Sequence, residues 1–152
     1  MSEAACHELR NICEKVIGDP DLMPKGGITW CNKAVDRICA YLGYAEFHGM
    51  MANGIIKHCQ VSGDFSPLLI TSATALAKAG RIVIAGQEGQ VHGHVAIVYP
   101  GRDIYSGKWQ VYVPQVANVG KSNGIMGVNY AFPAPPEFYI LKEAAQRLGG
   151  AL

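Results

Sequence analysis

Cys31 is the residue of this sequence whose type and neighbours best suit a catalytic nucleophile. It lies two residues after Thr29, which can cap a helix, and it starts an apolar helical stripe. A thiol in the first turn of a helix lies at the positive end of the helix dipole among free backbone N–H groups, and both favour the reactive thiolate. The same N–H groups can bind an oxyanion. The structural alternative is a buried core thiol on the apolar face of the helix.

His94 is the candidate base for such a thiol. It precedes the β-branched run Val95–Tyr99, and a papain-like mechanism needs an imidazole on a strand that faces a thiol at a helix tip. Gly93 allows another element to approach the backbone closely, and we expect this element to be the start of the Cys31 helix. His92 lies on the same predicted strand face and competes with His94 for the role of base.

An amide side chain can supply the third group that fixes the tautomer and ring orientation of the histidine. If the strands form a meander, the strand after the one that holds His94 is 109–115, and the polar candidates near its end are Gln115 and Asn118. An amide suffices, because the task is to accept the imidazole N–H. We take Gln115 as the orienting residue and Asn118 as its alternative; either can also be an ordinary loop amide.

Helices in the first half and strands in the second half must position these residues. Apolar residues spaced by four, three and four predict a first helix that ends at Gly18, and a second helix is expected between Thr29 and Gly43. Shorter helices are expected near 48–59 and 71–79. The predicted strands are 81–85, 95–99, 110–113 and 138–141. This order predicts an α+β fold, in a single domain of residues 1–152, with N-terminal helices packed on an antiparallel sheet.

Length and composition argue against several kinds of protein. A chain of 152 residues with 49% apolar and 16% charged residues suits one compact domain. The net charge of +1 offers no broad basic surface to nucleic acid, and no apolar run approaches the ~20 residues that span a bilayer. The first six residues lack a basic region followed by an apolar one, so we expect a chain made in the cytoplasm without a signal peptide.

The cysteines give further limits. No two of the five form a C-x-x-C pair, which argues against a zinc ribbon or a thioredoxin motif. Because five is odd, at least one thiol is left over if the others pair. The sequence leaves open how Cys6, Cys13, Cys39 and Cys59 pair, if they pair at all.

Two motifs together resemble a known family. Thr29-Trp30-Cys31-Asn32-Lys33-Ala34-Val35, followed by Gly93-His94-Val95-Ala96-Ile97-Val98, resembles the papain-like NlpC and CHAP-type cell-wall cysteine hydrolases. Among these, the chain is most similar to the small amidase effectors of type VI secretion, whose pattern also resembles Ile84-Ala85-Gly86 and Val119-Gly120-Lys121-Ser122-Asn123-Gly124. The resemblance extends from about residue 5 to residue 141.

The resemblance implies a fold, a reaction and a setting. The fold would be the papain-like NlpC/CHAP type, and the reaction would be hydrolysis of an amide in the stem peptide of peptidoglycan, commonly the γ-D-glutamyl–diaminopimelate bond. Cys31 would attack the carbonyl and His94 would move the proton, with no metal or organic cofactor required. The protein would act in the periplasm or cell wall of a target bacterium, as a secreted antibacterial effector or a phage lysin, with an inhibitory (immunity) protein as a possible partner.

Three other functions stay open. Gly86, His92 and His94 fit the G-x5-H-x-H start of a cupin metal site, although a helical first half does not suit a jelly roll. The chain can also be a non-catalytic binding or structural module of a phage or secretion particle. Finally, a cysteine protease or deamidase that acts on protein would use the same residues.

Overall fold

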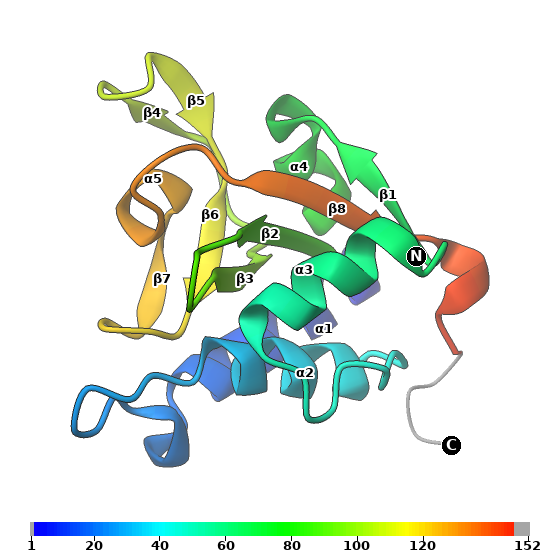
Figure 1. The fold of residues 1–152 in the computed structure, drawn as a ribbon. Helices are drawn as coiled ribbons and strands as arrows, with labels where there is room; N and C mark the ends of the chain where they lie inside the picture. The colour runs from blue at the N-terminus through cyan, green and yellow to red at the C-terminus, as the bar shows by residue number, and fades with distance from the viewer. Residues whose placement is uncertain (1, 148–152) are drawn as a thin grey trace.

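Helices occupy most of the first half of the chain, as the sequence predicts. The structure, a computed structural model, describes residues 2–147. The helices are α1 (Ser2–Ile17), α2 (Cys31–Tyr41), α3 (Ala52–Val61) and α4 (Ile70–Lys78), with a short 3₁₀ turn, η1 (Pro20–Leu22), between α1 and α2 (Figure 1). The apolar stripes that predicted α1 and α2 face the core: Leu9 and Val16 of α1, and Val35 and Ile38 of α2, are almost fully buried.

Most strands of the described residues join one antiparallel sheet. Its order is β1 (Phe65–Leu68), β8 (Glu137–Leu141), β2 (Val83–Gln87), β3 (His94–Val98), β6 (Gln115–Asn118) and β7 (Gly124–Gly127). A separate ribbon pairs β4 (Ile104–Ser106) with β5 (Val111–Val113). A short helix, α5 (Val128–Ala131), follows β7, and a 3₁₀ turn, η2 (Glu143–Ala145), follows β8. The predicted α+β class and the antiparallel sheet are confirmed.

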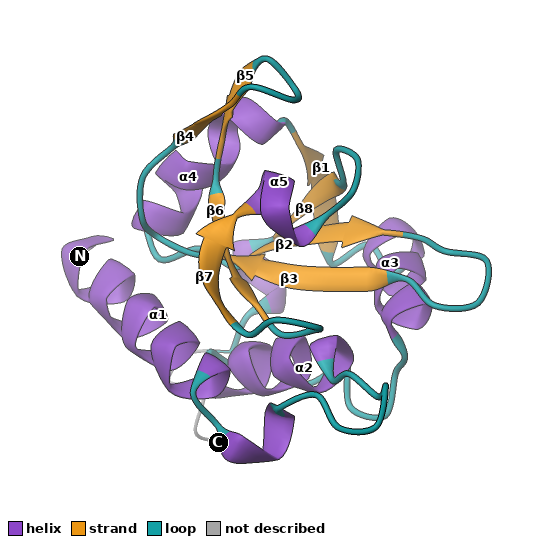
Figure 2. Cartoon of the chain, turned by 90° about the vertical axis from the view of Figure 1, so that its left-hand side faces the viewer, coloured by secondary structure: helices purple, strands orange, loops and turns teal. Residues whose placement is uncertain are grey.

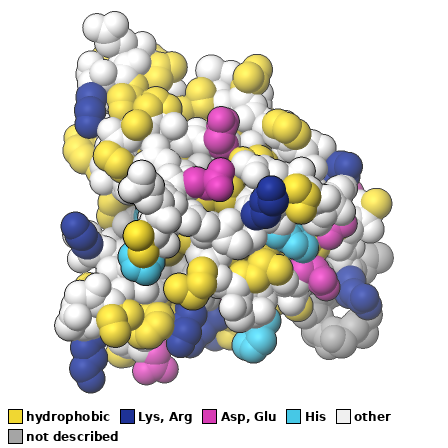
Figure 3. All heavy atoms as spheres, viewed as in Figure 1, with side chains coloured by type: hydrophobic (Ala, Val, Ile, Leu, Met, Phe, Trp, Pro, Cys, Tyr) yellow, Lys and Arg dark blue, Asp and Glu magenta, His cyan; other side chains and the backbone are white. Residues whose placement is uncertain are grey.

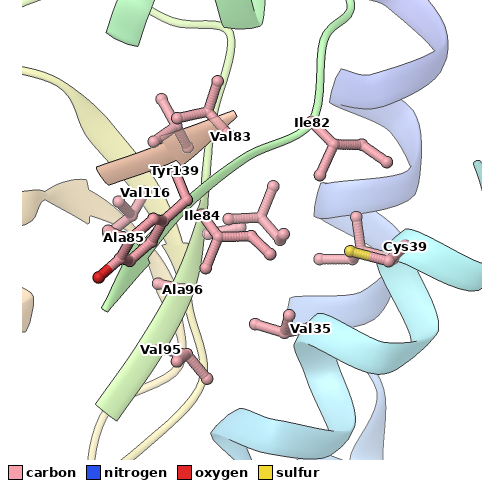
Figure 4. Close-up of a cluster of buried hydrophobic side chains, with 14 of the residues drawn as sticks. Val35, Cys39, Ile82, Val83, Ile84, Ala85, Val95, Ala96, Val116 and Tyr139 are labelled. Carbon is pink, nitrogen blue, oxygen red and sulfur yellow. The ribbon is translucent and has the colours of Figure 1, made fainter. Parts of the chain in front are cut away.

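Helices α2 and α3 pack against the central strands β2 and β3 (Figures 1 and 2). Figure 4 shows Val35 and Cys39 of α2 facing Ile82, Ile84 and Val95. Each of these side chains is at most 1% exposed. Because full burial of one aliphatic side chain of this size is worth ~1.5–3 kcal/mol, this contact holds α2 firmly against the central strands.

The strand beside β3 is not the one that a meander predicts. The expected neighbour, β5, pairs with β4 in the separate ribbon, and β6 takes the place beside β3. Pro114 lies between β5 and β6, where it interrupts hydrogen bonding because it has no N–H. The strand next to β3 therefore begins at Gln115, whereas a meander predicts that it ends there.

The surface carries charges of both signs. On the face drawn in Figure 3, basic and acidic side chains are interspersed, and hydrophobic side chains reach the surface between them. Within residues 2–147, no helix is both long enough and apolar enough to cross a bilayer.

Candidate active site

Cys31 is the first residue of helix α2. The N-cap position belongs to Trp30 rather than to the expected Thr29, and the Trp30 side chain makes no capping hydrogen bond. The N–H groups of the first turn, which have no partner within the helix, therefore stay available near the thiol. Cys31 is only 7% exposed, so its sulfur meets these groups in a largely dry environment.

Three backbone N–H groups act on the Cys31 sulfur and favour its thiolate: those of Val95, Asn32 and Cys31 itself. The pairing of strand β3 explains why the Val95 N–H is free to act on the sulfur. Along β3, alternate N–H groups point toward β6, as Tyr99 N–H does when it donates to the Gln115 carbonyl at 2.9 Å. The β3–β6 pairing ends at Ile97, so the Val95 N–H lies beyond the paired region and is left for the thiol.

The charge state of the thiol depends on two opposing effects. Burial raises the pKa of Cys31 above the ordinary value of 9.0, and the three backbone N–H groups lower it, with burial the larger effect. The resting group is therefore a protonated thiol at neutral pH. All five cysteines are free, and burial raises the pKa of Cys39 still more strongly. Cys39 is 0% exposed, which makes it a core residue.

His94 begins strand β3, and its ring is held by Asn118 at the end of β6. The His94 Nε2 lies 2.7 Å from the Asn118 Oδ1. The orientation of the amide is fixed independently, because the Asn118 Nδ2 donates to the Ser122 carbonyl at 2.8 Å. An amide oxygen can only accept, so the His94 Nε2 must carry the proton and Nδ1 keeps its lone pair. This is the tautomer that a base acting through Nδ1 requires.

The surroundings of His94 keep its ring neutral as well as oriented. The Phe132 ring packs against it at a centroid distance of 4.8 Å. Burial lowers the pKa of His94 below the ordinary value of 6.5, and the hydrogen bond to Asn118 opposes this shift. A neutral imidazole beside a protonated thiol is the resting state that these two pKa shifts favour.

The thiol and the imidazole come from adjoining positions in the fold. The Cys31 sulfur lies at the backbone of Val95, the residue after His94, yet no hydrogen bond joins the thiol to the ring among the described residues. A cleft of about 630 Å³ runs past the thiol. Trp30, Lys33 and Met51 are among its lining residues, and so is Cys31, but His94 is not. The thiol is thus reached from the cleft.

Gln115 does not meet His94, so the structure gives the orienting position to Asn118. The register pairs Ile97 with Ala117, which places Gln115 opposite Tyr99, at the other end of β3. Because side chains alternate along a strand, residues 115 and 118 also point to opposite faces. The Gln115 Oε1 instead accepts a hydrogen bond from the Arg102 N–H at 3.0 Å.

His92 and His94 differ in their surroundings. His92 lies in the loop before β3, where it is exposed and lines the cleft, and no side-chain hydrogen bond holds it within residues 2–147. Gly93 is approached by Asn53 of α3 rather than by the start of α2: a Cβ at Gly93 would lie 2.2 Å from the Asn53 Oδ1. The side chain of Asn53 also bonds both backbone groups of Gly89, so it fixes the loop that leads into His94.

Sequence reasoning missed several groups around the site. Phe132, Asn53 and the Val95 N–H were given no role in the site, because only the fold brings them beside Cys31 and His94. Ser122 had a signal, since it belongs to the quoted segment Val119–Gly124, but no role was assigned to it. For the cupin alternative, no group of three or more His, Cys, Asp or Glu residues within residues 2–147 is placed to hold a metal ion.

Two comparisons with known proteins were negative. A scan against models of protein families finds no match, and a search of curated proteins also finds none.

Proposed function

We propose that the protein is a cysteine hydrolase that acts through a covalent thioester on Cys31. One observation carries the proposal: a thiol at a helix start, among three backbone N–H groups, adjoins a histidine whose reactive tautomer is fixed by Asn118. A core cysteine needs none of these features. Their combination in one place is what nucleophilic catalysis requires.

The geometry supports general-base activation during attack. As the Cys31 sulfur bonds to the substrate carbonyl carbon, the thiol proton passes to the His94 Nδ1, and the carbonyl oxygen becomes an oxyanion within reach of the backbone N–H groups. When the tetrahedral intermediate collapses, the C–N bond breaks and His94 gives the proton to the leaving amine. Water then attacks the thioester, with His94 as base again, which releases a carboxylate and restores the thiol.

The particular substrate that we propose is an amide bond in the stem peptide of peptidoglycan, with the γ-D-glutamyl–diaminopimelate bond as the first candidate. The support is the resemblance of the segments around Cys31 and His94 to cell-wall hydrolases, together with the cleft of about 630 Å³ that Cys31 lines. In this proposal the protein is an antibacterial effector or a phage lysin that works in the periplasm or wall of a target cell. An inhibitory protein would protect the producer.

Digestion of purified peptidoglycan tests this function directly. The wild-type protein should release fragments whose combined mass exceeds that of the parent peptide by one water, with a new amino group on one of them. The control is Cys31→Ala, which lacks the nucleophile and should release none. If a protein substrate is cut or deamidated while peptidoglycan stays intact, the chemistry stands and the substrate is wrong. If the protein acts on neither substrate, it is a non-catalytic module.

A further inference from the structure

The segment after β6, residues 119–123, packs directly on the catalytic histidine. A Cβ at Gly120 would lie 3.3 Å from the His94 Cε1, so this backbone runs along the edge of the ring. The Ser122 carbonyl accepts the hydrogen bond that sets the Asn118 amide. The orientation of His94 therefore depends on where this segment holds the Ser122 carbonyl.

Asn123 holds this segment in place from both sides. Its Oδ1 accepts a hydrogen bond from the Gly120 N–H at 2.9 Å, which closes the turn on itself. Its Nδ2 donates to the Leu22 carbonyl at 2.9 Å, which ties the turn to η1 in the distant N-terminal half. One side chain thus sets both the shape of the turn and its position.

The η1 turn is a firm anchor. The Leu22 side chain is completely buried. Asp19 caps the turn by accepting the Asp21 N–H at 2.9 Å, and its carboxylate also forms an ion pair with Arg37 of α2. Arg37 belongs to α2, which begins at Cys31. The ion pair therefore ties the η1 turn to the helix that carries the thiol. Asn123 therefore connects the Cys31 side of the site to the His94 side.

We propose that Asn123 is a positioning residue: it holds the Ser122 carbonyl against the Asn118 amide and so keeps the His94 ring in the orientation that presents Nδ1 to the thiol. The catalytic part of this inference rests on the hydrolase function proposed above. The structural part, the fixed His94 N–H, is independent of any substrate.

NMR of the His94 imidazole proton tests the structural part without an activity assay. In the wild type, the Nε2–H donates to a buried amide oxygen and should exchange slowly with water. In Asn123→Ala, the loosened turn should raise the exchange rate at least about tenfold, because opening a local hydrogen-bonded unit exposes its protons. The matched control is Ser122→Ala, which keeps the backbone carbonyl and should leave the exchange rate unchanged.

Kinetics on the substrate test the catalytic part. Asn123→Ala should lower kcat roughly tenfold, since small errors in the placement of a catalytic group are costly, while KM changes less than about twofold. If the variant fails to fold, Asn123→Asp serves in its place, because it keeps the acceptor for the Gly120 N–H and replaces the donor to the Leu22 carbonyl with a carboxylate oxygen that repels it. A folded variant with a wild-type exchange rate and wild-type kcat would overturn the proposal. If the wild type hydrolyses nothing but Asn123→Ala still exchanges the His94 proton faster than the wild type, the proposed function fails and the positioning role of Asn123 stands.

Discussion

Replacement of Asn118 by alanine should separate a catalytic role of the His94–Asn118 pair from a merely structural one. The change removes the acceptor that lies 2.7 Å from the His94 Nε2 and the donor to the Ser122 carbonyl. Leaving one buried donor unpaired costs about 1–3 kcal/mol of stability. The ring can then rotate, or protonate on Nδ1, and both states are unable to take the thiol proton. We expect kcat to fall by roughly ten- to a hundredfold, or ~1.4–2.7 kcal/mol of barrier, with little change in KM.

The matched control for this change lies on the same strand. Gln115→Ala removes an amide of the next larger size from the opposite face of β6, where it bonds the Arg102 N–H, and should leave kcat within about threefold of the wild type. Release of fragments from peptidoglycan, followed as initial rates on both folded variants, gives the comparison. If Gln115→Ala is the more damaging change, the proposed orientation of His94 is wrong. If neither matters, Cys31 and His94 act as a dyad.

Asn118→Asp gives a second test of the same pair, with a definite sign. A carboxylate that accepts the Nε2–H stabilises the imidazolium, so it should raise the pKa of His94, whereas burial lowers that pKa in the wild type. Because the base must be neutral to act, activity is lost as the pH falls through the pKa of His94. The acid limb of the kcat/KM profile should therefore move to higher pH in this variant. An unchanged or opposite shift would contradict the assigned contact.

Three further outcomes are expected. Iodoacetamide should modify Cys31 before the fully buried Cys39, whose pKa burial raises more strongly, and peptide mapping that found Cys39 modified first would reverse their roles. His94→Ala should abolish fragment release while His92→Ala, at an exposed loop position, keeps most of it; the reverse result would exchange their roles. Gly93→Ala should lower the free energy of unfolding by about 1–3 kcal/mol, because the new Cβ would collide with the Asn53 side chain. Gly107→Ala is the control, since a Cβ there has no neighbour within 4 Å and should leave the free energy of unfolding unchanged. Denaturant titration of both variants measures the difference.

The fold was predictable from the sequence where a single pattern dominates a segment. Helix α2 and strands β2 and β3 are buried and apolar along their cores, and periodicity finds such elements. Strands β6 and β7 escaped prediction, since neither four-residue segment has a strong pattern of its own: β7, with the sequence Gly-Ile-Met-Gly, shows no alternation of apolar and polar residues. Short strands of this kind form because the neighbouring strand supplies their partners, not because of their own composition.

The error about the third residue has the same origin. A meander with no excursion would have placed the strand ending at Gln115 beside His94. The β4–β5 ribbon and the break at Pro114 shift the pairing, so that Gln115 starts the adjacent strand. Gln115 and Asn118 are three residues apart on β6, and an odd spacing puts two side chains on opposite faces of a strand. The two amides therefore have different surroundings, although both lie near the end of the predicted strand. Only the register distinguishes them.

Burial has opposite effects on the two central groups, and this shapes the proposed chemistry. It raises the pKa of the Cys31 thiol and lowers that of the His94 imidazole, so a standing ion pair is disfavoured and the resting thiol is a poor nucleophile. The same dry surroundings strengthen the backbone N–H groups as donors to a developing oxyanion. The site is therefore better suited to the transition state than to the free thiolate. In the proposed mechanism, the proton therefore moves only as the sulfur attacks a bound carbonyl, and the buried thiol stays inert until a carbonyl is in place.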